Sequence, residues 1–212
     1  MDFKAARARL VDCLRTRIED ERVLEAISRV PRERFVPLGE KPQAYEDKPL
    51  PIGLGQTISQ PYIVALMTQA LELTGKEKVL EVGTGSGYQA AILAELAGLV
   101  ITVERLPELA EAARRTLDSL GYKNIRVRLA GLKMGWQAEA PYDAIVVSAG
   151  APGVPDSLLS QLAIGGRMVI PVGHRYEQDL YKITRCRDKN IIENLGGCRF
   201  VSLIGEDAWD SE

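Results

Sequence analysis

Apolar residues in the N-terminal part of the chain recur at helical spacing and form two separate stripes. This period predicts two amphipathic helices within residues 2–29, and Pro31 and Pro37 end the helical region. The apolar positions of the two stripes are Leu10, Leu14, Ile18, Val23, Leu24 and Ile27.

The segment from Pro42 to Gln60 differs, because it is rich in proline and glycine and shows neither helical nor strand periodicity. A loop of this length is uncommon in a compact domain unless it has a function. Pro61 can open a helix directly afterwards, because the N–H that proline lacks has no partner in the first turn of a helix. We therefore expect a functional loop followed by a helix.

Short apolar runs alternate with helical segments from residue 78 onward. A run such as Ile145–Val147 has no polar face, which is typical of a strand buried on both sides in a parallel sheet. The alternation predicts an α/β fold with a doubly wound, mostly parallel sheet that carries helices on both faces. The expected strands are Lys78–Val82, Leu99–Val103, Ile125–Leu129, Ala144–Ser148 and Met168–Val172, and the expected helices are Tyr88–Ala97, Pro107–Leu120 and Pro155–Leu162.

The pattern changes after Gly173, where short apolar segments are separated only by turns. These segments predict antiparallel strands at one edge of the sheet. Their expected ranges are Leu180–Cys186, Ile191–Leu195 and Arg199–Ile204.

Composition excludes several classes of function. Hydrophobic residues make up 46% of the 212 residues and charged residues 26%, which is the balance of a globular domain with its own core. A formal net charge of -2, without a basic stripe, argues against binding to nucleic acid. Three distant cysteines and the single histidine, His174, show no metal-ligand spacing, so we expect no metal.

Neither the N-terminal residues nor the apolar runs of the chain suggest a membrane protein. Residues 1–10 carry charges and lack the apolar core of a signal peptide. No apolar run approaches the roughly 20 residues that a membrane-spanning helix requires. The expected location is therefore the cytoplasm.

The strongest local signal for a ligand site lies in Val79–Tyr88, where a buried strand runs into a turn with glycine at Gly83, Gly85 and Gly87. Glycine lets the backbone adopt positive φ and approach a ligand closely. In an α/β sheet, ligands bind at the carboxyl ends of the strands, so this turn is expected to bind a nucleotide or nucleoside.

The spacing of these glycines distinguishes between two ligands. A dinucleotide fingerprint would place its third glycine at Tyr88, one residue later than Gly87. The observed pattern, with Glu81 two positions before the first glycine, resembles motif I of class I methyltransferases, whose cofactor is S-adenosylmethionine. Glu104 ends the next strand, where an acid can accept hydrogen bonds from both ribose hydroxyls. The expected cofactor-binding residues are Glu81, Gly83, Thr84, Gly85, Ser86, Gly87 and Glu104.

Outside this motif, the chain resembles the protein-L-isoaspartate O-methyltransferases over roughly residues 20–209. The Gly55–Pro61 run, Gly-Gln-Thr-Ile-Ser-Gln-Pro, is the most specific part of the resemblance. The other matching stretches are Val30–Pro37, Tyr45–Asp47, Leu50–Gly53, Ala140–Ile145, Gln161–Leu162, Gly165–Gly166, Ile170–Gly173, Arg199–Val201 and Leu203–Gly205.

The resemblance implies one methyltransferase domain and a repair activity on damaged proteins. It divides the chain into N-terminal helices and an active-site loop (1–60), a cofactor-binding core (61–173) and C-terminal strands (174–212). The implied reaction methylates the free α-carboxylate of L-isoaspartyl residues and starts their repair through a succinimide. The implied partners are therefore proteins or peptides that contain such residues.

The resemblance also implies roles for individual residues. Ser59 matches the residue assigned as catalytic, and Thr57, Ile58, Ser59 and Val172 are the expected substrate-binding residues. A structural alternative for Ser59 is a helix N-cap before Pro61, because serine is favoured at that position. The two roles are compatible.

One departure from the family pattern affects the cofactor site. Gly131 stands where the family usually has the aspartate that is expected to hold the adenine amino group. The loss of one hydrogen bond should cost about 0.5–1.5 kcal/mol. This departure leaves open a cofactor-binding module without catalytic activity. A methyltransferase for another acceptor, such as a metabolite or RNA, is a second alternative, which the Gly55–Pro61 run weakens.

Overall fold

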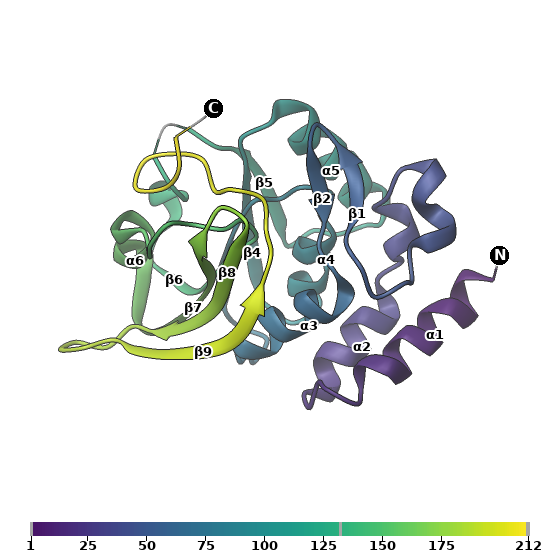
Figure 1. The fold of residues 1–212 in the computed structure, drawn as a ribbon, viewed down its shortest axis with the longest axis horizontal. Coiled ribbons are helices and arrows are strands. Elements are labelled where there is room, and N and C mark those ends of the chain that lie inside the picture. The colour runs from purple at the N-terminus through teal and green to yellow at the C-terminus, as the bar shows by residue number, and fades with distance from the viewer. Residues whose placement is uncertain (1, 132, 211–212) are drawn as a thin grey trace.

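The computed structural model describes residues 2–131 and 133–210. Its centre is a seven-stranded sheet in the order β5-β4-β3-β6-β7-β8-β9 (Figure 1). The strands are β3 Lys78–Val82, β4 Leu99–Glu104, β5 Ile125–Leu129, β6 Tyr142–Val147, β7 Leu162–His174, β8 Glu177–Thr184 and β9 Ile191–Cys198. The first five strands of this order pair in parallel, and β8 and β9 continue the sheet antiparallel.

Helices complete the layers of the fold. They are α1 Phe3–Leu14, α2 Glu21–Arg29, α3 Pro61–Ala70, α4 Tyr88–Ala94, α5 Pro107–Ser119 and α6 Asp156–Gln161. Short 3-10 helices lie at η1 Arg32–Arg34, η2 Leu38–Gln43 and η3 Gln137–Glu139. Within the described residues, no helix is both long enough and apolar enough to cross a membrane.

The sheet separates two hydrophobic cores because successive side chains of a strand point to opposite faces. On β3, Val79 packs with the core that contains α1–α4 and part of α5. The next residue, Leu80, packs with the other core, which includes Leu158 of α6. Both faces of the central strands are therefore buried, as the continuous apolar runs predict.

The predicted strand–helix order is confirmed, with shifts at several ends. The largest extension is at β7, which begins at Leu162 directly after α6 rather than at Met168. The helix expected over Tyr88–Ala97 ends at Ala94. Such shifts arise because tertiary pairing, rather than the apolar pattern alone, sets where an element ends.

Two sequence-based expectations are wrong in kind. Residues 42–60 are not an irregular loop, because β1 Leu50–Gly53 and β2 Gln56–Ile58 form an antiparallel hairpin. Its turn carries positive φ at Gly53, Leu54 and Gly55 (93°, 54° and 71°). Strands this short leave no detectable period in the sequence.

The segment Arg199–Ile204 is not an edge strand. It crosses the carboxyl end of the sheet, where Gly150 N donates to Val201 O at 2.8 Å and Leu203 N donates to Gly150 O at 2.8 Å. The segment therefore makes isolated bridges, Ser202 with Gly150 and Ile204 with Trp209, instead of a continuous strand pairing.

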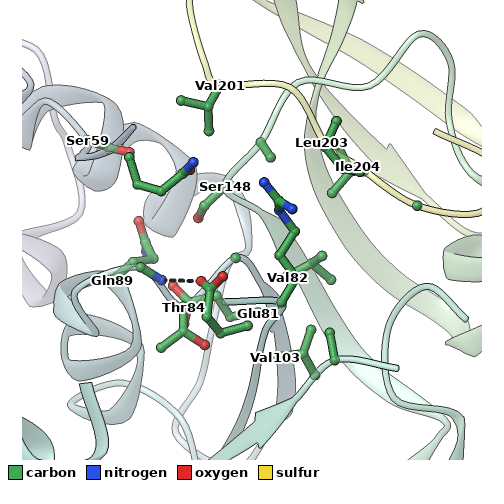
Figure 2. A pocket seen from close by; sticks show the side chains of 18 of the residues that line it. Ser59, Glu81, Val82, Thr84, Gln89, Val103, Ser148, Val201, Leu203 and Ile204 are labelled. Carbon is green, nitrogen blue, oxygen red and sulfur yellow. Dashed lines mark hydrogen bonds between the residues drawn. The ribbon is translucent and has the colours of Figure 1, made fainter. Parts of the chain in front are cut away.

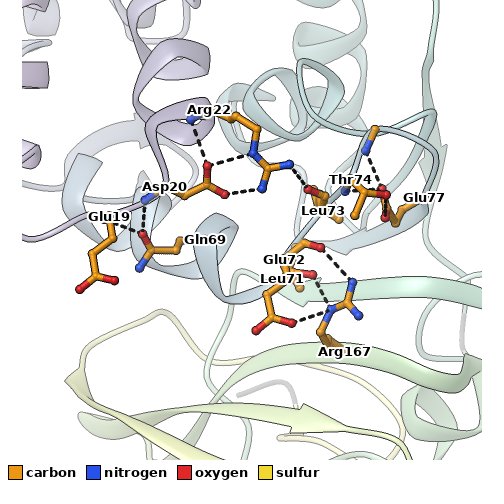
Figure 3. Close-up of polar contacts among 11 residues, drawn as sticks. Glu19, Asp20, Arg22, Gln69, Leu71, Glu72, Leu73, Thr74, Glu77 and Arg167 are labelled. Atoms are coloured by element: carbon orange, nitrogen blue, oxygen red, sulfur yellow. Dashed lines mark hydrogen bonds and ion pairs between the residues drawn. The ribbon is translucent and has the colours of Figure 1, made fainter.

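Polar contacts join the N-terminal helices to the connection between α3 and β3 (Figure 3). Gln69 Oε1 accepts from the N–H groups of Glu19 (2.8 Å) and Asp20 (2.9 Å). Arg22 Nη1 donates to Leu73 O at 2.7 Å, and Arg167 of β7 donates from Nε to Leu71 O at 2.6 Å. These bonds satisfy backbone groups at the end of α3 and attach it to both neighbouring layers.

Glu77 organises the turn that follows (Figure 3). Its Oε2 accepts from the N–H groups of Thr74 (2.9 Å), Gly75 (2.9 Å) and Lys76 (3.1 Å), and its Oε1 accepts from the Thr74 hydroxyl at 2.6 Å. Burial raises the pKa of Glu77, but these hydrogen bonds to the charged form outweigh burial and lower the pKa to about 2 from 4.5.

The low pKa of Glu77 predicts that the fold loses stability in acid. Because the pKa is lower in the folded state, the stabilisation is complete above the unfolded value of 4.5 and is lost as pH falls toward about 2. We expect Glu77→Gln to reduce the free energy of unfolding at neutral pH by about 1.5–3 kcal/mol and to flatten its decline below about pH 4.5. Urea titrations across this range, with the exposed Glu177→Gln as control, test this; parallel pH profiles for wild type and Glu77→Gln would contradict it.

Candidate active site

A single cavity lies at the carboxyl ends of β3, β4 and β6 (Figure 2). Its open space, counted out to the mouth and including the solvent there, is ≈ 1000 Å³. The lining comes from segments far apart in sequence, including residues 56–59, 81–86, 103–105, 133–135, 148–149 and 201–205.

The topology explains why the cavity forms here. The chain proceeds outward from β3 to β4 and β5, then returns to place β6 on the other side of β3. The connections after β3 and β6 therefore diverge to opposite sides, and a crevice opens between them at a topological switch point.

The glycine turn after β3 forms the floor of this crevice. Gly83, Gly85 and Gly87 have φ values of 97°, 52° and 89°, a region that L side chains rarely adopt. The N–H groups of Gly83 and Thr84 donate to Val103 O at 2.9 and 3.1 Å, which holds the turn against β4.

Gly87 has a separate, structural reason to be glycine. It is the N-cap residue of α4 and does not appear among the residues that line the cavity. A Cβ at this position would lie 3.3 Å from side-chain atoms of Ala113 and Leu117 on α5. Gly87 therefore allows α4 and α5 to pack closely, whereas Gly83 and Gly85 face the cavity.

Glu81, at the end of β3, is completely buried and borders the cavity. Its Oε2 accepts from Thr102 Oγ1 at 2.5 Å, and the Thr102 hydroxyl also contacts Thr84 Oγ1 at 2.6 Å. Burial raises the pKa of Glu81 to about 8, an effect that the Thr102 hydrogen bond opposes and the nearby Glu104 carboxylate increases. Oε1 has no hydrogen-bond partner among the described residues.

Glu104, at the end of β4, has both of its oxygens attached to the backbone. Oε2 accepts from Gly85 N at 2.9 Å, and Oε1 accepts from Leu106 N at 3.0 Å. These bonds fix the carboxylate at the cavity wall, and each oxygen keeps a second lone pair that can accept from a ligand hydroxyl.

Residues 57–59 line the cavity, and Ser59 lies on the opposite side of it from Leu203 and Ile204 (Figure 2). Ile58 is buried, Ser59 is half-buried and Thr57 is exposed. Ser59 is not the N-cap of α3, because Gln60 occupies that position. Asp47 satisfies the helix start instead, since its Oδ1 accepts from Tyr62 N at 2.8 Å. The structural alternative predicted for Ser59 is therefore wrong.

The structure brings together most of the residues that sequence reasoning selected. Those that line the cavity are Thr57, Ile58, Ser59, Glu81, Gly83, Thr84, Gly85, Ser86 and Glu104. Val172 does not appear in that lining; it forms an isolated parallel bridge with Ala151 instead.

Sequence reasoning missed several wall residues. Gln89 lies on the cavity side of α4, and its Nε2 donates to Thr68 Oγ1 at 2.8 Å. Residues 201–205 form the far wall, although their pattern suggested a strand. Gln161 supports a third wall from behind, because its Nε2 donates to Met134 O and its Oε1 accepts from Trp136 N, both at 2.9 Å.

Comparison with known proteins assigns this fold and cavity to a family. The sequence model described as Protein-L-isoaspartate(D-aspartate) O-methyltransferase matches residues 5–208. A protein-L-isoaspartate O-methyltransferase of Geobacter metallireducens is 55% identical, and the match covers 100% of both chains. One from Syntrophus aciditrophicus is 58% identical over 98% of this chain and 97% of its own.

The chain belongs to the protein-L-isoaspartate(D-aspartate) O-methyltransferase family.

Solved structures of similar proteins agree with this membership. A protein-L-isoaspartate O-methyltransferase superimposes with a TM-score of 0.83 and 28% identity, covering 95% of this chain and 67% of that one. A second, described as a putative protein-L-isoaspartate O-methyltransferase from Plasmodium falciparum in complex with S-adenosyl-L-homocysteine, has a TM-score of 0.82 and 26% identity over 94% and 99% of the two chains. The methyltransferase fold predicted from the sequence is confirmed.

The departure at Gly131 lies within the cavity of this family member. Gly131 lines the wall, and a Cβ added there would meet nothing within 4 Å. A side chain could therefore begin at this position without a clash at its Cβ.

Replacement of the buried Glu81 is expected to change the free energy of unfolding in the opposite direction to replacement of Glu77. Its pKa is about 8 in the folded protein against 4.5 when unfolded, so the folded state is penalised increasingly as pH rises from 4.5 toward 8. We expect Glu81→Gln, which keeps the shape, to raise the free energy of unfolding at pH 8 and to change it little near pH 4.5. One pKa unit corresponds to about 1.4 kcal/mol, which sets the scale of the gain.

Urea unfolding of wild type and Glu81→Gln at both pH values measures this difference. A variant less stable than wild type at pH 8 would show that the carboxylate is stabilised in its charged form.

Proposed function

We propose that this protein transfers a methyl group from S-adenosylmethionine to the free α-carboxylate of L-isoaspartyl residues in damaged proteins and peptides. The methyl ester then closes to a succinimide, which begins repair of the chain. One observation carries the proposal. A single cavity is bordered both by the glycine turn at 83–86 and by the specific Thr57–Ser59 segment.

The residues of the cavity fit this cofactor. Gly83 and Gly85 leave the floor free of side chains, and Glu104 retains acceptor capacity for ribose hydroxyls. Oε1 of the buried Glu81, which has no partner among the described residues, is a further polar atom that can hydrogen-bond a polar group of the ligand. S-adenosylmethionine, when bound, supplies an electrophilic methyl group on a positively charged sulfur.

The acceptor needs no general base. An α-carboxyl group has a pKa of about 3.3–3.7 and is therefore already ionised at neutral pH. The single histidine, His174, is exposed at the end of β7 and does not appear in the lining of the cavity. The residues around the cavity thus need to orient the carboxylate and exclude water rather than remove a proton.

Exclusion of water matters because nucleophile and electrophile carry opposite charges that are neutralised in the transition state. Water stabilises the separated charges and so opposes the reaction. Apolar side chains of Ile58, Val103 and Leu203 border the cavity and reduce access of water to the reacting atoms.

Ser59 is the proposed contact to the acceptor carboxylate. Its hydroxyl is not used to cap α3, and the residue is half-buried at the cavity wall. We assign it the role of hydrogen-bond donor to the acceptor carboxylate, not of nucleophile. Thr57 and Ile58 extend the same surface for the peptide.

The proposal places the reaction in the cytoplasm and gives nucleic acid no part in it. The described cysteines, Cys13, Cys186 and Cys198, are all free, as is usual in a reducing compartment. A formal net charge of -2 does not favour binding to the phosphates of nucleic acid.

A labelled-cofactor assay tests the function directly. The purified protein is incubated with S-adenosylmethionine that carries a labelled methyl group and with an isoaspartyl peptide or its normal aspartyl counterpart. We expect base-labile methyl ester on the isoaspartyl peptide alone. Ester on neither peptide, with the cofactor still bound, would instead indicate a binding module, and label on another acceptor would indicate a different methyltransferase.

Ser59→Ala should lower turnover and leave cofactor affinity nearly unchanged. The loss of one hydrogen bond to a charged group costs about 1.5–3 kcal/mol, which corresponds to a roughly 10- to 100-fold decrease in kcat/KM for the peptide. Steady-state kinetics and calorimetry with S-adenosylhomocysteine measure the two effects. Ser160→Ala, on the exposed side of α6, is the matched control. Loss of cofactor binding in Ser59→Ala would show that Ser59 contacts the cofactor rather than the acceptor carboxylate.

A further inference from the structure

Arg32, in η1, is a charged residue in an unusual environment. Its exposed fraction is 0%, although arginine is rarely buried completely without an acidic partner. No carboxylate of the described chain forms an ion pair with it. Its Nε and Nη1 atoms are buried without a hydrogen-bond partner in the same set of residues. The guanidinium therefore makes few polar contacts with the described residues.

Two contacts of the Arg32 side chain are made with residues that line the cavity. Nη2 donates to the backbone oxygen of Ser59 at 2.8 Å. The guanidinium carbon lies 4.8 Å from the centroid of the Tyr88 ring, in cation–π geometry. Tyr88 is the first residue of α4, directly after Gly87, and both Ser59 and Tyr88 line the cavity.

Neighbouring packing fixes this arrangement. The Phe35 ring meets the Tyr88 ring edge-on, with centroids 5.5 Å apart and an interplanar angle of 65°. The Tyr88 ring is thus restrained from one side by Phe35 and carries the guanidinium at 4.8 Å. A planar guanidinium can stack and donate a hydrogen bond at the same time, which a lysine ammonium does poorly.

Stability alone does not account for Arg32. Burial lowers the pKa of its guanidinium, which reflects the cost of removing the charge from water. Replacing buried charges by apolar residues of similar volume is often neutral or stabilising. A side chain that served only to fill this space would be better replaced by a residue such as methionine.

We propose that Arg32 is a positioning residue for the acceptor: it holds the Ser59 carbonyl while its guanidinium lies over the Tyr88 ring, and so sets Ser59 relative to the glycine turn. The inference rests on the proposed function, because it concerns the site for the isoaspartyl carboxylate. Arg32 itself does not appear among the residues that line the cavity, so it acts through Ser59.

The proposal predicts which kinetic quantities change. A misplacement of about 1 Å between reacting groups can cost on the order of 100-fold in rate. Release of the Ser59 carbonyl should therefore raise KM for the peptide and lower kcat. The glycine turn keeps its own bonds to Val103 O, so cofactor affinity should stay within about 2-fold.

The test compares Arg32→Met, Arg32→Lys and the control Arg34→Met, which makes the same substitution at an exposed arginine two residues along the chain. We expect kcat/KM for an isoaspartyl peptide to fall about 100-fold in Arg32→Met and about 10-fold in Arg32→Lys. Arg34→Met should match wild type. Calorimetry with S-adenosylhomocysteine, then with peptide added to that complex, gives the two dissociation constants separately.

The outcomes separate a positioning role from a structural one. A structural role would lower the free energy of unfolding in urea and leave kcat and KM unchanged per folded molecule, and this result overturns the proposal. Equal loss of cofactor and peptide affinity also overturns it. If Arg32→Met does not fold, Arg32→Lys decides, because wild-type kinetics in that variant contradict the inference. If wild type methylates no isoaspartyl peptide, the proposed function fails, and this role of Arg32 fails with it.

Discussion

The reversal of strand order at β3 is the constraint on which the rest of the structure depends. Because β4 and β6 flank β3 on opposite sides, the connections that leave β3 and β6 must separate at their carboxyl ends. The sheet brings most of the lining to this separation, and the β1–β2 hairpin adds residues 56–59. The glycine turn, Glu104 and the segment at 201–205 share no sequence proximity, and each reaches the cavity because the strand before it or beside it ends there.

Several ionisable side chains are buried in the molecule, and some of them stabilise the fold whereas others destabilise it. Glu77 is surrounded by hydrogen-bond donors and is held in its charged form, so it stabilises the fold. Glu81 has one donor and a high pKa, and Arg32 has two nitrogen atoms without a partner among the described residues. Charges that cost stability lie at or beside the cavity, whereas the charge that gains it lies at the opposite end of β3. Such a distribution is expected at a ligand site, where residues are kept for the geometry that the ligand needs even though they lower the stability of the fold.

The sequence predicts local features well and non-local ones poorly. The apolar runs of β3 and β6 and the helix starting at Pro61 could be identified because each has a period or a terminating residue of its own. The Glu81–Gly87 spacing identified the cavity floor for the same reason. By contrast, the segment Arg199–Ile204 has the alternation of an edge strand, but its contacts with distant residues such as Gly150 and Gln178 place it at the cavity wall. A local sequence pattern cannot reveal contacts of this kind.

The start of α3 shows the same limit in a functional residue. Serine before Pro61 is a reasonable N-cap from local preference, but Asp47, 15 positions before Tyr62, supplies the acceptor. Since Asp47 also binds Gln60 and Arg17, the loop is anchored at its start and its hairpin projects from a fixed base. Because Asp47 rather than Ser59 accepts the hydrogen bond at the start of α3, Ser59 can have a role in the cavity. Ser59 is released from a structural task, its carbonyl is held by Arg32 from behind, and its hydroxyl is free to serve a ligand at the cavity wall.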